Sequence, residues 1–327
     1  MILRSSNFLG LSVTDRGIAC AEVSVNGGKR VVRRLDTFVP PKDAPLDKPE
    51  AAGAALAAFL RQHKFSASRA VVGLPAKWLF ATERDLPPAA EEQARGMLRL
   101  QAERLAVSES GDMVFDYAGK TDATKPNKVL LVGVLRQRLD QVEGLVDAAG
   151  LSAVAVTSAA MALSRGARGG DQDAPMLVLG GHGAEMVWRH DGAPRMLRHV
   201  SGLTMNGHGP TNVGPLGSEL GRTVTMTRAN GRPAKSEILM WDGVGLSPAQ
   251  VAELSERSGL QLRPSDATAM LGLETLPVAL TTAADRAGSA AADAETFAPA
   301  LALALAGADR GLLPLDFTRS RLTPRKK

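Results

Sequence analysis

Two short apolar runs joined by a tight turn open the chain and constrain its fold more than any other stretch. Residues 8–13 and 18–25 are mainly apolar, and Thr14-Asp15-Arg16-Gly17 separates them. Such a pair, joined by a turn that ends in glycine, is typical of a β-hairpin. A third run over residues 30–39 follows the Asn26-Gly27-Gly28 turn. The sequence therefore predicts a three-stranded meander at the start of the chain.

The element order of this first part returns in the second half of the chain. After the meander, the residue patterns predict a helix over 50–63 and a strand over 69–74, which gives the order β-β-β-α-β. The same order follows from predicted strands over 176–179, 184–188 and 195–200, a helix over 211–228 and a strand over 237–241. Two structurally similar α/β lobes are expected from element order alone, because no sequence repeat is visible.

Further elements are expected outside these two repeats. Pro87-Pro88 is predicted to start a helix, Ser247 to cap one, and residues 166–174 to form a linker. The remaining predicted strands are 81–86, 113–117, 128–135 and 153–156, and the predicted helices are 87–107, 139–149, 158–164, 247–258 and 295–307.

Composition excludes several classes of protein. The 44% hydrophobic and 22% charged residues are typical of a globular chain. The net charge of +5 equals the five positive charges of residues 318–327, and aromatic residues make up only 4%, which argues against a nucleic-acid-binding face. The single cysteine, Cys20, lies in an apolar strand and is expected to be a buried, inert thiol in a reducing compartment. The longest apolar run, 297–308, is too short to span a bilayer, and no signal peptide is evident.

No catalytic constellation is found. Gly27-Gly28-Lys29 lacks the preceding glycine of a P-loop, and there is no G-x-S-x-G motif of a serine hydrolase. The five histidines show no ligand spacing, and one cysteine argues against a structural zinc site, so no metal site is predicted. Asp171-Gln172-Asp173 is interpreted as a solvated linker.

The stretch over residues 100–163 resembles the PilM family of type IV pilus assembly and the related cytoplasmic region of GspL proteins of type II secretion. In that family an E-A-E-R helix precedes an (L/F)-D-Y strand, and a helix ending in A-G-(L/I) follows. The resemblance continues through residues 238–248 and 299–314, so it spans nearly the whole chain. The matching residues are Ala102-Glu103-Arg104-Leu105, Phe115-Asp116-Tyr117, Ala148-Ala149-Gly150-Leu151 and Ala162-Leu163.

This resemblance implies an α/β, actin-like (ribonuclease H-like, duplicated) fold with two lobes and a small inserted α+β subdomain. The first lobe would cover residues 1–165, including the inserted subdomain at about 76–150. The second lobe would cover 174–308, with a C-terminal helix that returns to the first lobe. A basic tail, 309–327, would follow and would lie next to a membrane.

ATP-binding members of this family carry two phosphate loops, and both have diverged here. Where the first loop has aspartate, glycine and lysine, this chain has Ser12, Thr14 and Ala19, and where the second has aspartate it has Leu179. Without these acids Mg²⁺ lacks its usual carboxylate ligands. We therefore expect no ATP hydrolysis and no cofactor. Binding of ATP and Mg²⁺ is the alternative. The remnants of the phosphate loops would either let a phosphate approach the backbone or only form tight turns. They are Gly10, Ser12, Thr14, Gly180, Gly181, Gly183, Gly243 and Gly245.

The C-terminal stretch carries the most direct functional signal. Residues 311–317 resemble the "NLLP" peptide with which PilN-type membrane partners begin, and in that family the peptide docks between the first lobe and the inserted subdomain. Partner binding is therefore predicted for Leu312, Leu313, Pro314, Leu315 and Phe317. The basic residues that follow fit the positive-inside rule and suggest a membrane-spanning helix soon after residue 327, the alternative being a solvated basic terminus. These residues are Arg319, Arg321, Arg325, Lys326 and Lys327.

The resemblance implies a non-catalytic scaffold at the cytoplasmic side of a bacterial inner membrane. It would link a cytoplasmic secretion or pilus ATPase to a PilN-like or GspM-like membrane protein, either as a monomer or as a homodimer. Three alternatives stay open: an ATP-binding member of the same fold, a filament-forming protein of the FtsA or MreB kind, and a sugar kinase. The predicted proline break at Pro324 argues against the amphipathic end helix of FtsA-like proteins.

Overall fold

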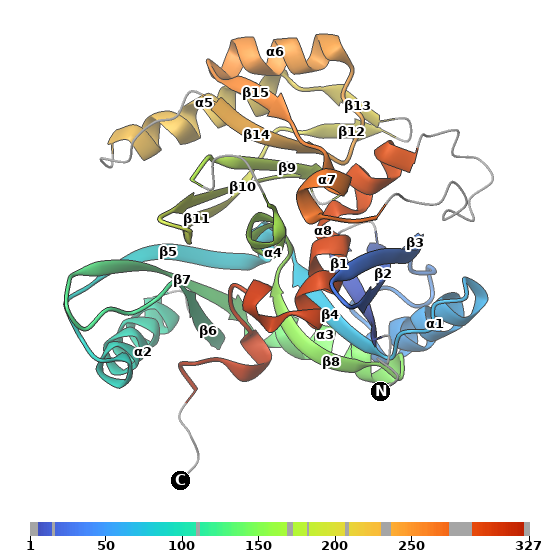
Figure 1. Ribbon diagram of the computed structural model, residues 1–327, viewed down its shortest axis with the longest axis horizontal. Coiled ribbons are helices and arrows are strands. Elements are labelled where there is room, and N and C mark those ends of the chain that lie inside the picture. Colours follow the sequence, from blue (N-terminus) through green and yellow to red (C-terminus); the bar gives the residue numbers. More distant parts are fainter. Residues whose placement is uncertain are drawn as a thin grey trace.

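The computed structural model describes residues 6–14, 17–108, 112–168, 173–181, 183–206, 209–229, 237–274 and 290–323. The chain forms two five-stranded sheets of the same strand order, and Figure 1 labels the strands of both. The first sheet has the order β3-β2-β1-β4-β8 and the second has β11-β10-β9-β14-β15. In each sheet the meander is antiparallel and the later strands run parallel to its first strand. The duplicated order predicted from the sequence is confirmed.

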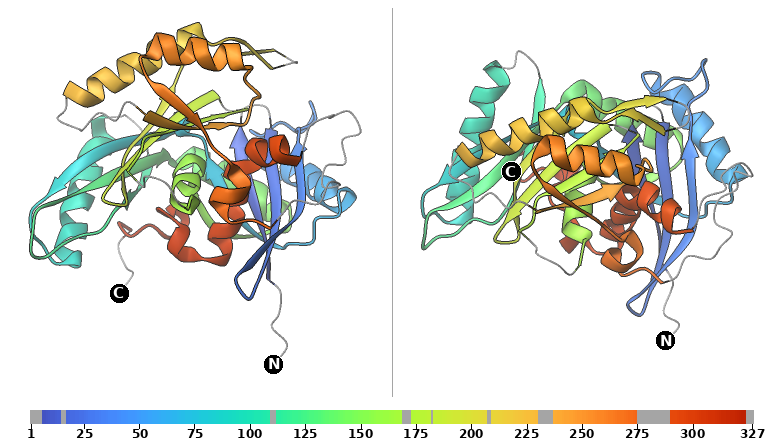
Figure 2. Two further views of the ribbon diagram at one scale, coloured as in Figure 1. Left: turned by 45° about the horizontal axis from the view of Figure 1, so that its top comes forward. Right: turned by 90° about the horizontal axis from the view of Figure 1, so that it is seen from above.

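The first sheet is formed by the N-terminal meander and two later strands. Its strands are β1 (Ser6–Thr14), β2 (Gly17–Asn26), β3 (Lys29–Phe38), β4 (Arg69–Leu74) and β8 (Ser152–Ser158). Helices α1 (Pro49–Gln62) and α3 (Arg136–Ala148) pack against each other on one side, and α4 (Ala159–Gly166) and α8 (Ala290–Ala308) cover the other. Figure 2 shows these layers from two further sides. Because both faces are covered, the central strands are apolar on both faces, as the neighbouring residues Val71 and Val72 of β4 illustrate.

The second sheet belongs to the other lobe. Its strands are β9 (Met176–Gly180), β10 (Gly183–His190), β11 (Ala193–Val200), β14 (Glu237–Asp242) and β15 (Gln261–Pro264), with a small hairpin of β12 (Thr204–Asn206) and β13 (Gly209–Asn212) beside it. Helices α5 (Gly214–Ala229) and α6 (Pro248–Ser258) pack together over it, and the short α7 (Ala267–Leu271) contacts α8. Ser247 caps α6 as predicted, in a reciprocal capping box with Gln250.

A three-stranded sheet, β5-β7-β6, is inserted between β4 and α3. It consists of β5 (Leu79–Leu86), β6 (Met113–Ala118) and β7 (Asn127–Leu135), with α2 (Glu91–Ser108) packed on it and the one-turn helix η1 (Ala76–Trp78) at its start. The prediction that Pro87-Pro88 starts α2 was wrong, since the helix begins at Glu91. The two prolines lie in the connection, where Ala89 N–H donates to the carbonyl of Asp122. The lobe and subdomain boundaries stay predictions.

A buried carboxylate joins the second sheet to the start of this inserted part. Glu185 on β10 is fully buried and accepts a hydrogen bond from the N–H of Ala76. Strand β11 also packs against β5, β7 and η1. The second lobe therefore rests on the inserted subdomain as well as on α8.

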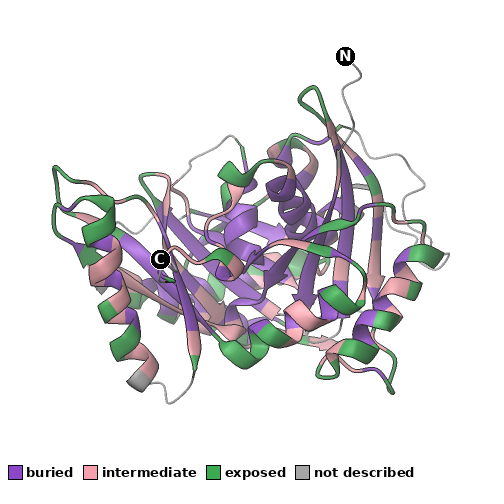
Figure 3. Cartoon of the chain, turned by 90° about the horizontal axis from the view of Figure 1, so that it is seen from below, coloured by how far each residue is buried: buried purple, intermediate pink, exposed green. Residues whose placement is uncertain are grey.

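Helix α8 is buried along its whole length from residue 297 to residue 307. Figure 3 colours it and the central strands as buried, whereas the outer helices mix buried and exposed residues. It is built mainly from alanine and leucine, so that its backbone approaches β1 closely. A Cβ added to Gly10 would lie 1.8 Å from the carbonyl oxygen of Ala300. Cys20 is fully buried, as predicted, and burial raises the pKa of its thiol.

The contact between Gly10 and α8 can be tested by substitution. We expect Gly10→Ala to lower the free energy of unfolding by about 2 kcal/mol or more, because the new methyl group meets backbone that cannot rotate away. The matched control is Gly96→Ala in α2, where an added Cβ meets nothing within 4 Å, and which should raise stability by up to about 1 kcal/mol. Urea unfolding measures both. A Gly10→Ala chain as stable as the wild type would contradict this packing.

Candidate functional site

The two turns that correspond to the phosphate loops lie close together. The Thr14 side chain lies 3.6 Å from the position of a Cβ added to Gly181, so its hydroxyl and methyl groups fill the space between the two turns. The Thr14 hydroxyl donates to the carbonyl of Gly17, 2.9 Å away, and Ser12 is buried. His182 lies outside the described residues. The structure brings the two loop remnants together, but it places no acidic side chain at the Ser12 or Leu179 positions.

The glycines of these loops have other structural tasks. Gly10 allows α8 to approach β1, and a Cβ added to Gly243 would lie 2.7 Å from the carbonyl oxygen of Leu179. Gly183 and Gly245 have φ of +104° and +74°, a region that side chains other than glycine rarely adopt. Close packing and turn geometry thus account for these four glycines without a phosphate.

The backbone N–H groups after β14 are already occupied. The carboxylate of Asp242 accepts hydrogen bonds from the N–H groups of Val244, Gly245 and Leu246, at 3.1, 2.9 and 2.7 Å. A phosphate bound by this loop would need the same donors. Because a carboxylate already carries the negative charge there, a nucleotide would have to displace it.

The C-terminal stretch lies in a groove of its own chain. We call residues 309–323 the tail segment. It consists of the one-turn helices η2 (Arg310–Leu312) and η3 (Phe317–Arg319) and the residues around them, and η3 contacts both β8 of the first sheet and β6 of the inserted sheet. Figure 1 shows the tail segment, in red, passing beside these two strands. The resemblance implies that such a peptide, as part of a partner, docks between the first lobe and the inserted subdomain, whereas here the peptide at this position is part of the chain itself.

Apolar side chains anchor the tail segment. Leu315 and Phe317 are each 3% exposed and belong to the main core cluster, and Leu322, 5% exposed, belongs to the core of the inserted part. Leu313 packs on a smaller cluster around Val71. Burying a side chain of this size contributes about 1.5–3 kcal/mol. The tail segment therefore bridges the cores of the first lobe and the inserted subdomain.

Asp116 on β6 is the polar centre of the groove. Its side chain is 1% exposed, and it accepts hydrogen bonds from the N–H groups of Asp316 (2.9 Å) and Arg321 (3.2 Å). The Arg321 guanidinium lies 3.3 Å from the same carboxylate and 3.7 Å from the centre of the Tyr117 ring. The Phe115-Asp116-Tyr117 motif, found in the sequence only as a mark of resemblance, thus contacts the tail segment directly.

Burial raises the pKa of the Asp116 carboxyl above its usual value, although Arg321 and the backbone donors oppose the shift. A raised pKa in the folded chain means that this group's contribution to stability falls as pH rises from its usual pKa through the raised one. The buried charge therefore costs stability at neutral pH. Apolar burial holds the tail segment in place, and Asp116 fixes its register by requiring N–H donors at Asp316 and Arg321.

Asp316 ties the tail segment to β8. Its carboxylate accepts hydrogen bonds from the N–H of Val156 (3.4 Å) and the hydroxyl of Thr318 (2.7 Å), and Arg310 lies 3.4 Å from it. Arg310 also donates to the carbonyl of Val154. Two carboxylates therefore fix the tail segment in the groove. Asp116 of the inserted sheet accepts N–H groups of the tail segment, and Asp316 of the tail segment accepts an N–H group of β8.

The predicted site residues have different surroundings. Leu315 and Phe317 are buried in the groove, whereas Leu312, Leu313 and Pro314 are half-buried along it. Of the predicted basic residues, Arg319 is exposed and Arg321 is bound to Asp116, while Arg325, Lys326 and Lys327 lie outside the described residues.

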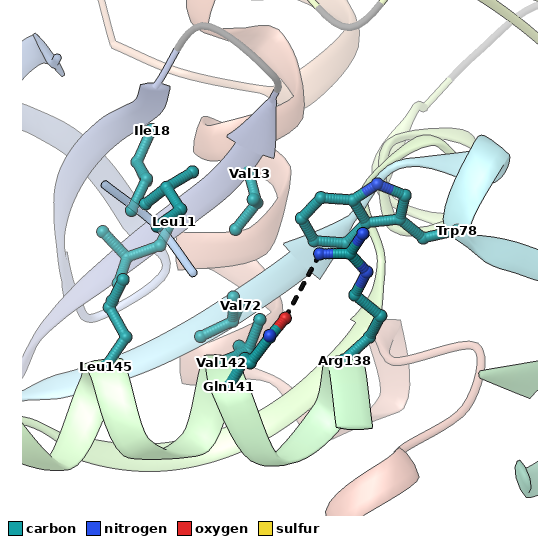
Figure 4. Close-up of a pocket in the computed structure, with 10 residues that line it drawn as sticks. Leu11, Val13, Ile18, Val72, Trp78, Arg138, Gln141, Val142 and Leu145 are labelled. Atoms are coloured by element: carbon teal, nitrogen blue, oxygen red, sulfur yellow. Dashed lines mark hydrogen bonds between the residues drawn. The ribbon is translucent and has the colours of Figure 1, made fainter. Parts of the chain in front are cut away.

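A small apolar cavity lies on the opposite side of the first sheet. Its volume is about 50 Å³, and Leu11, Val72 and Val142 line it between β1, β4 and α3 (Figure 4). Arg138 lies over the Trp78 ring at 5.0 Å and donates to Gln141 at the edge of the cavity. This volume is far below that of a nucleotide site, which occupies several hundred Å³.

Comparison with solved structures identifies the fold. A chain of the PilM–PilN type IV pilus biogenesis complex superimposes with a TM-score of 0.70 at 17% identity, over 94% of this chain and 98% of that chain. The predicted actin-like fold is confirmed. Two more distant structures are the cytoplasmic domain of EpsL, an inner membrane component of the type II secretion system of Vibrio cholerae (TM-score 0.48, 15% identity, 80% and 90% covered), and the ethanolamine utilization protein EutJ from Carboxydothermus hydrogenoformans (0.47, 10%, 93% and 90%). No family model and no curated protein matches the chain.

The described residues include no helix of the length and apolarity needed to cross a membrane. Helix α8, the longest apolar one, is instead packed between the strands and helices of the two lobes.

Docking of the tail segment can be measured with a single substitution. We expect Phe317→Ala to weaken it by about 3–5 kcal/mol, because a fully packed ring is lost. Hydrogen exchange at the amides of Asp316 and Thr318 should accelerate accordingly. The control, Arg319→Ala, removes an exposed side chain from the same turn and should change stability by less than about 0.5 kcal/mol. Unchanged protection in Phe317→Ala would show that the tail segment does not dock as described.

Proposed function

We propose that this chain is a non-catalytic scaffold of a bacterial inner-membrane assembly platform, in a type IV pilus or a type II secretion system. The observation that carries the proposal is the tail segment, which resembles the first residues of PilN-type proteins and lies between β8 and β6 of its own chain. The same chain would thus supply both a PilM-like body and the peptide that docks on it.

The fold supports this proposal. The structure with a TM-score of 0.70 comes from a PilM–PilN type IV pilus biogenesis complex. We propose that the body of this chain corresponds to PilM and its tail segment to the first residues of PilN. The first partner would be a PilN-like or GspM-like membrane protein. The second would be a cytoplasmic secretion or pilus ATPase. A homodimer of this chain is compatible with both.

The proposed location is the cytoplasmic side of the inner membrane. The tail segment carries the exposed Arg319 near its end, and the basic residues Arg325, Lys326 and Lys327 follow it. A cluster of this kind is attracted to anionic lipid by about 1 kcal/mol for each residue near the surface. Membrane association would therefore begin where the tail segment leaves the groove.

Deletion and complementation in the source bacterium test the scaffold. We expect loss of surface pili or of secreted proteins on deletion of the gene, because the ATPase would no longer reach its membrane partners. Wild-type protein and the Thr14→Ala variant should restore the function, since no phosphate chemistry is required. A variant with Leu315→Asp and Phe317→Asp should not restore it, because the buried charges expel the tail segment. If piliation and secretion both stay intact on deletion, the proposal is wrong.

Nucleotide binding separates this proposal from an ATP-binding member of the same fold. We expect no heat of binding when ATP and Mg²⁺ are titrated into the full chain at about micromolar to millimolar concentrations. The reasons are that Ser12 and Leu179 stand where the family has its acids, and that Asp242 already accepts the N–H groups of the loop after β14. An actin-like ATPase measured in the same way serves as a positive control. Binding in the micromolar range would favour the alternative function.

A further inference from the structure

The apolar cavity between the first sheet and α3 has a mouth of different chemistry from its walls. At the mouth, Leu46, Trp78 and Gln141 are half-buried, and Arg138 is exposed. Figure 4 shows Trp78 and Arg138 at one end of the cavity and aliphatic side chains at the other. A ligand can therefore enter beside Arg138 and meet an apolar interior. The buried side chains of that interior are Leu11, Val13, Ile18, Val72, Val142 and Leu145.

The size of the cavity selects a small aliphatic group. Its volume of about 50 Å³ is several times the roughly 10–15 Å³ that holds one water molecule. It is also only about a third of the roughly 150 Å³ in which a benzene ring binds. Water gains little there, because the interior offers no polar partner. The end of one branched aliphatic side chain is the group that fills it best.

Arg138 adds a positive charge at the mouth. Its guanidinium lies 5.0 Å from the centre of the Trp78 ring and donates to the side-chain oxygen of Gln141, 3.2 Å away. In the part of the chain that the structure describes, Arg138 forms no ion pair, and the amide nitrogen of Gln141 has no hydrogen-bond partner. A guanidinium and an amide N–H side by side are donors that suit a carboxylate. The ligand therefore carries a carboxylate beside its aliphatic group.

The position of the charge selects among carboxylates. Arg138 lines the cavity itself, so the carboxylate that it binds lies next to the aliphatic group inside. In an extended peptide, neighbouring side chains point to opposite faces, so an acidic residue beside the buried one would point away from the mouth. The α-carboxylate of a C-terminal residue is instead attached to the same Cα as the buried side chain. A chain that ends in leucine, isoleucine or valine fits both features.

An open hollow beside the mouth has room for the residues that precede such a terminus. Its volume is about 600 Å³, and it lies along the first turns of α3, with Pro49 and Asp112 at its sides. Gln141 lines both the hollow and the cavity, so the two are continuous. Leu135, which is 43% exposed, lines the hollow and offers an apolar contact. A small acid bound in the cavity would leave this surface uncovered, whereas a peptide would cover it.

We propose that the cavity and the hollow together bind the C-terminus of a partner protein that ends in a branched aliphatic residue. The terminal side chain fills the cavity, Arg138 and the Gln141 amide bind the terminal carboxylate, and the preceding residues cover Leu135. No residue of the tail segment lines either space. The proposal does not depend on the assembly role, because it rests on the cavity, its charge and the hollow. Its binding test and the deletion test of the scaffold can therefore fail separately.

The indole N–H signal of Trp78 in a nitrogen–proton correlation spectrum reports on the mouth of the cavity. The chain has three tryptophans, of which Trp188 and Trp241 are buried, and Trp78→Phe assigns the signal. In the full chain we expect N-acetyl-leucine to shift this signal saturably at about millimolar concentration. N-acetyl-leucinamide, which lacks the charge, should bind about tenfold more weakly. N-acetylglycine, which lacks the aliphatic side chain, should cause no shift at the same concentration.

Two substitutions and a matched control assign the parts of the site. Arg138→Gln should weaken N-acetyl-leucine about tenfold and leave N-acetyl-leucinamide unchanged, because only the carboxylate meets the guanidinium. Val142→Ile adds one methyl group to a wall of the cavity and should weaken both ligands without lowering the urea midpoint. The control, Arg104→Gln, removes an exposed arginine of α2 that likewise has no ion pair with a described residue. It should change binding by less than about twofold.

A peptide distinguishes a protein terminus from a small acid. We expect N-acetyl-Ile-Ser-Ile-Leu with a free carboxylate to bind about tenfold more tightly than N-acetyl-leucine, because it also contacts the hollow. Leu135→Ser should remove this advantage and leave the affinity for N-acetyl-leucine unchanged. The variant should fold, since serine is a preferred residue at the N-cap position that Leu135 occupies in α3.

Four results would overturn the proposal. The first is an unchanged Trp78 signal with N-acetyl-leucine, and the second is equal weakening in Arg138→Gln and Arg104→Gln. The third is a peptide that binds no more tightly than N-acetyl-leucine, because the cavity would then take a small acid only. The fourth is equal binding of the same peptide with an amidated C-terminus, because no terminal carboxylate would then be recognised.

Discussion

The close approach of α8 to β1 is the contact on which the rest of the structure depends. Nine of the ten residues over 297–306 are buried at 1% exposure or less, so the helix has no free face along this stretch. It packs on the first sheet through Gly10 and Gly73 and meets the second lobe at Gly243. Small side chains in the helix and glycines in the strands make this distance possible. This helix therefore contacts both lobes and, together with the contact between β11 and the inserted subdomain, holds them in one arrangement.

That packing requires glycine at two positions of the loops whether or not a phosphate binds. A side chain at Gly10 would collide with the backbone of α8, and one at Gly243 would collide with the backbone of Leu179. Glycine is therefore needed at both positions with or without a nucleotide. The aspartates and the lysine that act on a nucleotide in the family are not needed for this packing. Aspartate and lysine at the Ser12, Leu179 and Ala19 positions could be lost while the fold was kept. The fold and the chemistry are therefore constrained by different residues in the same loops.

Local patterns predicted the strands and helices of both repeats well, because alternation, caps and turn residues act over a few positions. Ser247 and the Asn26-Gly27-Gly28 turn are examples. The short β15 and α7 escaped prediction because four or five residues carry too little periodicity. Asp116 could not be assigned a role either, since its partners lie 200 and 205 residues away in the sequence. Predicting the groove would have required the positions in space of both its strands and the tail segment. In the sequence, only the resemblance of residues 311–317 suggested the groove.

The covalent link between the tail segment and its groove has a consequence for stoichiometry. A tethered peptide meets its site at an effective concentration of about millimolar, set by the length of the connection. Here η2 begins directly after α8, so the connection is only a few residues long. A free peptide of equal affinity would have to exceed that concentration to compete. Each copy of the chain thus carries one filled groove, independent of how much partner the cell makes.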